Sequence, residues 1–225
     1  MSSPIANNSK SVIQQIAVSI HQHAAHGKRV EQLIIALSEV IAGLDSVATC
    51  VDVGCGDMSL AEGLAIRLPE TSWTCLDLYP VPQEKSQELR WNKYRQFDGE
   101  KIPFADQSYD AILFSDVLHH ASETESVSLI NEALRVSRYV VIKDHFEHSI
   151  WSRLMLQLMD IYGNWGYGVS IPKRYFTNDS FQALAISCGC KVSIVRNQIA
   201  LYEHIPILRH ILRPNWHFIA VLKKT

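Results

Sequence analysis

Two glycines and two carboxylates surround the turn that follows the apolar run at residues 49–53. Gly54 and Gly56 have no side chain, so backbone N–H groups can approach a ligand at the start of the next helix. A dinucleotide enzyme holds a pyrophosphate at such a turn, but here Asp52 and Asp57 make the pocket acidic. An acidic pocket suits a cationic amino-acid ligand. The residues expected to line it are Asp52, Gly54, Cys55 and Gly56.

A further carboxylate, Asp77, ends the next apolar run about 20 residues beyond the glycine turn, where an acidic residue accepts both hydroxyls of a ribose. A ribose without a phosphate partner fits adenosine. Further along the chain, Asp98 is placed to accept the adenine amino group, and Gly99 offers a backbone contact. Leu78 and Ser115, at the ends of two predicted strands, complete the expected cofactor-binding set. Together these residues would hold an amino acid, a ribose and a base.

On these residues the chain resembles the class I S-adenosylmethionine-dependent methyltransferases, specifically the small ubiquinone/menaquinone-methyltransferase-like (type 11) group. The resemblance covers about residues 47–141 and rests on four motifs in order, Val51–Asp57, Leu76–Leu78, Ile102–Asp110 and Ser115–His120. It implies that the cofactor is S-adenosylmethionine, with Asp52 and the glycine turn at its methionine part, Asp77 at its ribose and Asp98 at its adenine. Many relatives have a third glycine where this chain has Met58, a side chain that either narrows the pocket or starts the helix.

Methyl transfer from a sulfonium has a neutral leaving group, so the enzyme must align the reactants and, for a protonated nucleophile, remove one proton. Ligands of α/β sheets bind at the carboxyl ends of the strands, which places Ser115–His120 and Lys143–His148 near the acceptor. Asp116 is expected to cap the start of the helix that follows it. The candidate catalytic residues, in order, are His145 with Asp144 orienting its ring, then His120, then His148. For each histidine the alternative is an ordinary hydrogen-bonded or surface side chain.

Ten histidines raise the question of a metal site. His21, His23 and His26 lie close together, and His145 and His148 have H-x-x-H spacing. Neither group has the supporting cysteines or carboxylates that a zinc site needs. We therefore predict no metal site.

The elements that must position these residues follow a regular alternation. Apolar runs bounded by turn residues alternate with segments of helical period, which is the pattern of a mostly parallel sheet covered by helices. Strands are predicted at Thr49–Val53, Trp73–Asp77, Tyr94–Phe97, Tyr109–Ser115, Tyr139–Lys143, Lys191–Val195 and Trp216–Leu222. Helices are predicted at about 58–68, 82–90, 123–135, 151–162 and 178–188. The predicted fold is α/β, a Rossmann-like methyltransferase fold with a seven-stranded sheet.

Two further segments are expected to border the ligands. Residues about 9–26 and 28–43 are predicted as amphipathic helices, so residues 1–45 form a helical extension that acts as a lid, and residues 46–225 form the methyltransferase domain. The glycine- and aromatic-rich segment Gly163–Gly168 is predicted as a loop over the acceptor. A chain of 225 residues is long enough for one domain, which is what we expect overall.

Composition excludes several classes of protein. Hydrophobic residues make up 47% and charged residues 20%, as in a globular protein. The formal net charge of -2 offers no basic excess for a nucleic-acid partner. No run approaches the ~20 apolar residues of a membrane span, so no membrane insertion is expected. Five cysteines without C-x-x-C spacing indicate buried thiols in a reducing compartment, and a cytoplasmic location is expected.

The function predicted from all these features is transfer of a methyl group to oxygen or carbon of a small-molecule acceptor, an apolar or aromatic metabolite. Two alternatives stay open. One is methylation of RNA or protein, against which stand the missing basic patch and the sequence Ser115-Asp116-Val117-Leu118 after the fourth strand. The other is a cofactor-binding module without turnover. The sequence does not decide between a monomer and a homodimer.

Overall fold

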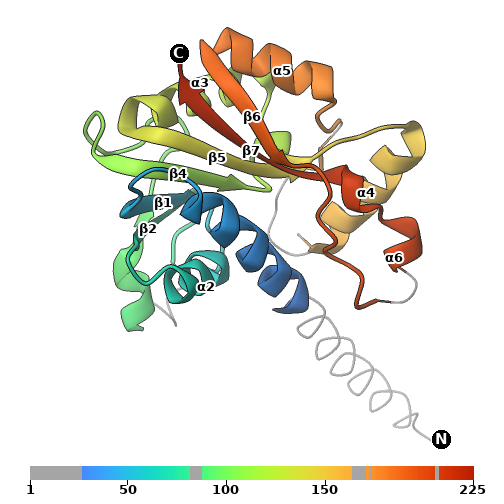
Figure 1. Ribbon diagram of the computed structural model, residues 1–225, viewed down its shortest axis with the longest axis horizontal. Coiled ribbons are helices and arrows are strands. Elements are labelled where there is room, and N and C mark those ends of the chain that lie inside the picture. Colours follow the sequence, from blue (N-terminus) through green and yellow to red (C-terminus); the bar gives the residue numbers. More distant parts are fainter. Residues whose placement is uncertain (1–26, 82–87, 164–170, 173, 206–207) are drawn as a thin grey trace, which may run out of the picture.

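The computed structural model describes residues 27–81, 88–163, 171–172, 174–205 and 208–225. Its centre is a seven-stranded sheet with the strand order β3-β2-β1-β4-β5-β7-β6 (Figure 1). The strands are β1 (Thr49–Val53), β2 (Ser72–Asp77), β3 (Tyr94–Gln96), β4 (Tyr109–Ser115), β5 (Ser137–His145), β6 (Cys190–Arg196) and β7 (His217–Lys224). Only β7 runs against its neighbours β5 and β6, so the prediction of a mostly parallel, seven-stranded sheet is confirmed and the sheet is mixed.

Six α-helices in the described part of the chain connect or flank these strands. Their bounds are 27–42, α2 (Ser59–Arg67), α3 (Glu123–Val136), α4 (Ile150–Gly163), α5 (Asn178–Ser187) and α6 (Leu208–Ile211). Short 3-10 helices are η2 (Leu89–Lys93), η3 (Leu118–His120) and η4 (Pro214–Trp216). The start of α3 is set by a capping box, because the Ser122 side chain accepts from the backbone of Glu125 while the Glu125 carboxylate accepts from the backbone of Ser122.

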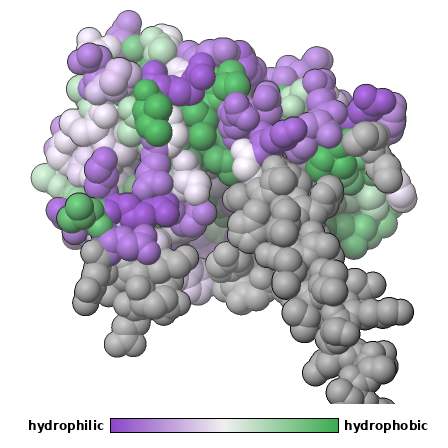
Figure 2. All heavy atoms as spheres, turned by 90° about the horizontal axis from the view of Figure 1, so that it is seen from below, coloured by the Kyte–Doolittle hydropathy of each residue, from purple (hydrophilic) through white to green (hydrophobic). Residues whose placement is uncertain are grey.

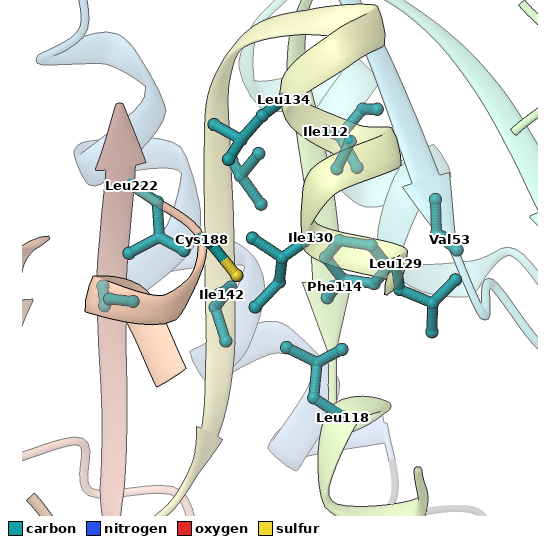
Figure 3. Packing of buried hydrophobic residues seen from close by; sticks show 14 of the residues in the cluster. Val53, Ile112, Phe114, Leu118, Leu129, Ile130, Leu134, Ile142, Cys188 and Leu222 are labelled. Carbon is teal, nitrogen blue, oxygen red and sulfur yellow. The ribbon is translucent and has the colours of Figure 1, made fainter. Parts of the chain in front are cut away.

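The helices cover both faces of the sheet. Figure 1 shows α3 and α5 on one face and helix 27–42 with α2 on the other. Residues alternate between the two faces along each strand. On β4, for example, Ile112 and Phe114 pack under α3, whereas Leu113 packs toward helix 27–42. In Figure 3, Ile130 of α3 lies among Phe114, Ile142 and Cys188, so this helix packs against that face of the sheet.

The carboxyl edge of the sheet is where the structure differs most from the prediction. Strand β5 was predicted to end at Lys143, but it continues through Asp144 and His145, which pair with Phe218 and His217 of β7. The polar residues Asp144 and His145 suggested a loop, but the antiparallel partner extends the ladder past them. Figure 1 shows α4, which follows β5, and α6, which precedes β7, beyond this edge.

Part of the predicted lid packs against the sheet. Helix 27–42 confirms the second of the two N-terminal helices, and its Leu33, Leu37 and Ile41 side chains are buried against the sheet. The predicted first helix at 9–26 lies outside the described residues, as do residues 164–168 of the predicted loop. A lid function for residues 1–45 therefore stays a prediction.

The surface of the described residues is mixed. Seen from below, hydrophobic side chains form separate patches among hydrophilic ones (Figure 2). Scattered exposed apolar side chains are ordinary for a folded domain. Among the helices of the described residues, none combines the length and apolarity needed to cross a membrane.

Candidate active site

The turn between β1 and α2 has the backbone conformation that its glycines predict. Gly54 has φ 76° and Gly56 has φ 53°, both in the left-handed region that favours glycine. A Cβ on Gly54 would stand 2.5 Å from a methyl group of Val117, so that position is sterically closed. A Cβ on Gly56 would meet nothing within 4 Å, so that position faces open space. The turn therefore has no room for a side chain at Gly54, whereas Gly56 borders open space among the described residues.

The two side chains between and after these glycines point away from the opening. Met58, where many relatives have glycine, adopts φ 64° and is 1% exposed in the core beneath helix 27–42. Cys55 is buried in the same core, and its thiol contacts the thiol of Cys75. Met58 therefore does not narrow the opening, and Cys55 offers it only backbone atoms.

The structure brings the predicted ribose residue to the glycine turn and the predicted adenine loop to Leu78. Asp77 at the end of β2 accepts a hydrogen bond from the Gly56 N–H at 2.8 Å. Beyond it, the side chain of Leu78 lies 2.7 Å from where a Cβ of Gly99 would stand, so these two residues are in close contact. Asp98 accepts from two backbone N–H groups of its own loop, which lower the pKa of its carboxyl.

Asp52 is the buried charge of this site. Its residue is 1% exposed and its Oδ2 atom has no hydrogen-bond partner. Burial, followed by the nearby carboxylates of Asp77 and Asp57, raises the pKa of Asp52 to about 7. A buried carboxylate with an unmatched oxygen beside an open glycine turn fits the ammonium group of an amino-acid ligand. The arrangement therefore fits the cofactor S-adenosylmethionine, and the roles of Asp52 at its amino acid and Asp77 at its ribose stay predictions.

This raised pKa predicts a pH dependence of ligand binding. A cationic ammonium binds the ionised form of Asp52 better, so binding releases a proton and the affinity rises as the pH rises toward about 7. Between pH 6 and pH 7.5 the affinity for S-adenosylhomocysteine should rise about tenfold, because roughly one tenth of the carboxyl is ionised one unit below its pKa. Calorimetry on wild type and Asp52→Asn measures this, and the variant should bind weakly with a flat profile. Parallel slopes for the two proteins would remove Asp52 from the site.

Ser115, at the end of β4, adjoins a second polar cluster. Its neighbour Asp116 has φ 59° and binds two cations, the Arg29 guanidinium at 2.6 Å and the Lys143 ammonium. These cations and His145 outweigh the effect of burial and hold the pKa of Asp116 well below its usual range. The prediction that Asp116 caps the following helix is wrong, because Val117 stands at the N-cap of η3 and Ser122 caps α3.

Asp144 contacts a different histidine from the one predicted. Its Oδ1 atom lies 2.7 Å from Nδ1 of His119 but 3.6 Å from Nδ1 of His145. The reason is strand alternation, since β5 continues to His145 and successive side chains point to opposite faces. Asp144 therefore holds the ring of His119, and it meets His145 through a hydrogen bond from the His145 backbone N–H.

His145 lies on the face of β5 that it shares with Lys143. Its Nδ1 atom is buried without a hydrogen-bond partner and stands 3.4 Å from Asp116. Burial and then the Lys143 charge lower the pKa of His145. Its ring packs on His217 of β7, with ring centroids 4.8 Å apart. Of the other candidates, His120 lies in η3, and His148 is exposed and contacts the Asn215 carbonyl.

A cavity of about 320 Å³ reaches this cluster from the segment before β7. Its lining includes apolar Ile199, Leu201 and Leu212, the charged Glu203 and Arg209, and His217.

Sequence reasoning missed this cavity, and it missed Arg29 and His119 as residues of the site. For His119 a signal existed, since it lies within the Ser115–His120 motif. For Arg29 there was none, because only the docking of helix 27–42 brings it to the sheet edge.

Residues 51–139 match the family model described as a methyltransferase domain. No curated protein matches the chain in sequence.

Several solved structures share the fold. The chain is similar to the mitomycin 7-O-methyltransferase MmcR, with a TM-score of 0.59 and 20% identity over 85% of this chain and 54% of that one. A SAM-dependent methyltransferase from Archaeoglobus fulgidus has a TM-score of 0.60 and 16% identity over 87% and 94%. The pyocyanin biosynthetic protein PhzM has a TM-score of 0.57 and 16% identity over 84% and 54%. The chain thus spans about half the length of MmcR and PhzM.

Proposed function

We propose that this chain transfers a methyl group to oxygen or carbon of a small-molecule acceptor. It carries a methyltransferase domain of the class I, S-adenosylmethionine-dependent fold. One observation supports the proposal most strongly. The open Gly56 position, the unmatched Asp52 carboxylate and the Asp77 carboxylate lie together at the carboxyl edge of the sheet. When bound there, S-adenosylmethionine supplies a methyl group on a cationic sulfur.

At this edge, residues of β1 and β2 would bind the cofactor. The Asp77 carboxylate accepts a hydrogen bond from the Gly56 N–H at 2.8 Å and so shapes the turn. We propose that the same carboxylate also accepts hydrogen bonds from the ribose hydroxyls. We propose that the adenine lies beside Leu78 and the loop at Asp98 and Gly99, because Leu78 is half exposed and touches that loop.

We propose His145 as the group that takes the acceptor's proton. Its unpartnered Nδ1 atom lies at the carboxyl end of β5, next to the strand β4 that borders the glycine turn. Asp144 accepts a hydrogen bond from the backbone N–H of His145 at 2.7 Å. A positioned base of this kind contributes roughly 10²- to 10⁴-fold to the rate.

The cavity before β7 is the proposed acceptor site. It reaches His217, whose ring packs against that of His145, so an acceptor seated there has its reactive end near the proposed base. Its lining combines apolar Ile199, Leu201 and Leu212 with polar side chains such as Glu203, Arg209 and His217. We therefore propose an acceptor with an apolar body and one polar end.

Asp77→Ala tests the cofactor site. The change removes hydrogen bonds to a carboxylate, each worth about 1.5–3 kcal/mol, so the affinity for S-adenosylhomocysteine should fall at least tenfold while the fold persists. Calorimetry measures the affinity, and circular dichroism checks the fold. Asp45→Ala, a change at an exposed carboxylate outside the site, should bind as the wild type does. Equal affinities for Asp77→Ala and wild type would rule out this position for the ribose.

The acceptor itself can be identified with a labelled methyl group. The protein is incubated with methyl-labelled S-adenosylmethionine and a metabolite extract, and Asp77→Ala provides the background. A labelled small molecule is the expected product. Label confined to RNA or protein would favour the macromolecular alternative, and no label above the background would favour a cofactor-binding module.

A further inference from the structure

The third buried histidine of the carboxyl edge, His119, has one ring nitrogen that the proposed function does not use. Its Nδ1 atom is hydrogen-bonded to Asp144 at 2.7 Å, but its Nε2 atom has no hydrogen-bond partner among the described residues. The side chain is fully buried, with an exposed fraction of 0%. A buried polar atom without a hydrogen-bond partner costs free energy unless a ligand supplies that partner.

Two further ligating groups face that nitrogen. The Oδ2 atom of Asp160, on α4, lies 3.5 Å from Nε2 of His119. This separation exceeds the ~2.7–3.2 Å of an N–H···O hydrogen bond. It equals the roughly 3.3–3.5 Å between two ligand atoms that share a tetrahedral zinc ion at about 2.0–2.2 Å each. A ring nitrogen of His120 lies with these two atoms inside one group whose members are all within 4.8 Å of one another.

We propose that His119 Nε2, His120 and the Asp160 carboxylate bind a divalent transition-metal ion such as Zn²⁺. Two imidazoles and one carboxylate form a common ligand set for such ions and leave a coordination position open. His120 is half buried, and its ring packs against that of His119 with the ring centroids 4.2 Å apart.

The surroundings supply the outer interactions that metal ligands have in proteins. A metal-bound histidine usually donates its other ring N–H to a carboxylate, which is the contact that Asp144 makes with Nδ1 of His119. A ligating carboxylate is usually hydrogen-bonded in turn, and the Tyr175 hydroxyl donates to Oδ2 of Asp160. These contacts place Nε2, rather than Nδ1, toward the ion.

The local charge also favours a cation at this place. Asp144 and Asp160 contribute two negative charges around His119. The nearby cations Arg29 and Lys143 are both bound to Asp116 instead. A second described group, which combines His119 with Asp116, Asp144 and His145, is a poorer site for the same reason, because a metal ion there would compete with both cations for Asp116.

This inference rests on the proposed function for what the metal does, because the open coordination position would bind an oxygen of the acceptor. It does not rest on that function for whether the metal binds. The sequence analysis predicted no metal site and did not consider these three residues together. His119 and His120 precede α3 whereas Asp160 lies in α4, so no local spacing connects them.

Metal binding is measured on the full chain after treatment with a chelator, with Zn²⁺ and Co²⁺ as the probes and without any acceptor. We expect one equivalent of either ion by calorimetry, and visible absorption bands for the Co²⁺ protein. Asp160→Asn and His120→Gln should weaken binding at least tenfold and abolish the bands. The control variants Asp45→Asn and His148→Gln, changes at exposed residues outside the proposed metal site and the acceptor cavity, should bind as the wild type does.

The outcomes are distinguishable from those of the cofactor tests. Asp160→Asn should keep its affinity for S-adenosylhomocysteine within a few-fold, which also shows that the variant is folded. His120→Gln, at a half-buried position, serves if Asp160→Asn fails to fold. The inference is overturned if the wild type binds no stoichiometric metal, or if both site variants bind Zn²⁺ as tightly as the two controls.

Discussion

Replacing Gly56 by valine is expected to abolish cofactor binding. Gly56 has φ 53°, a conformation that costs a residue with a side chain about 1–2 kcal/mol. No atom lies within 4 Å of the added Cβ, so the valine side chain projects into the open space above the turn. That space is the proposed place of the ligand. Calorimetry with S-adenosylhomocysteine should detect no binding, which corresponds to a loss of at least a hundredfold.

Gly189→Val is the matched control. Gly189, between α5 and β6, has φ 64° and also has no atom within 4 Å of an added Cβ. Both variants therefore carry the same backbone cost, and their melting temperatures should fall by similar amounts. Only Gly56→Val should lose the ligand. If Gly56→Val bound S-adenosylhomocysteine within a few-fold of Gly189→Val, the cofactor would lie elsewhere.

His145→Ala is expected to slow methyl transfer at least a hundredfold while the cofactor affinity stays within a few-fold. The imidazole is the proposed acceptor of the substrate proton, and a positioned base contributes roughly 10²- to 10⁴-fold. The cofactor residues lie on β1 and β2 and at their ends, so removal of a side chain from the end of β5 should leave them in place. Single-turnover transfer of labelled methyl to the identified acceptor measures the rate, and calorimetry measures the affinity.

His148→Ala provides the comparison for this experiment. His148 was also a candidate base, but it is exposed and contacts the carbonyl of Asn215, so its loss should leave the rate unchanged. A His145→Ala protein that turns over as fast as His148→Ala would exclude His145 as the base. Transfer would then depend on alignment of the reactants alone or on another group at the sheet edge.

The sequence by itself determined the parts of this protein that depend on neighbouring residues. The bounds of β1 and β4 were predicted as the structure has them, because each is an apolar run between clear turn residues. The glycine turn was likewise predictable, since two glycines between a strand and a helix favour left-handed backbone there. Asp77 ends β2 as predicted, and the parallel pairing of β1 with β2 brings it to that turn.

Only the tertiary structure decided which side chains meet at the carboxyl edge. Asp144 follows Lys143 in the chain, but the extension of β5 along β7 turns it toward His119 and leaves His145 beside Asp116. Arg29 comes to Asp116 from a helix that precedes the sheet. Such contacts depend on the face to which a strand residue points and on the helix docked against it. A linear pattern reports the period of one element and carries no information about its neighbour in space.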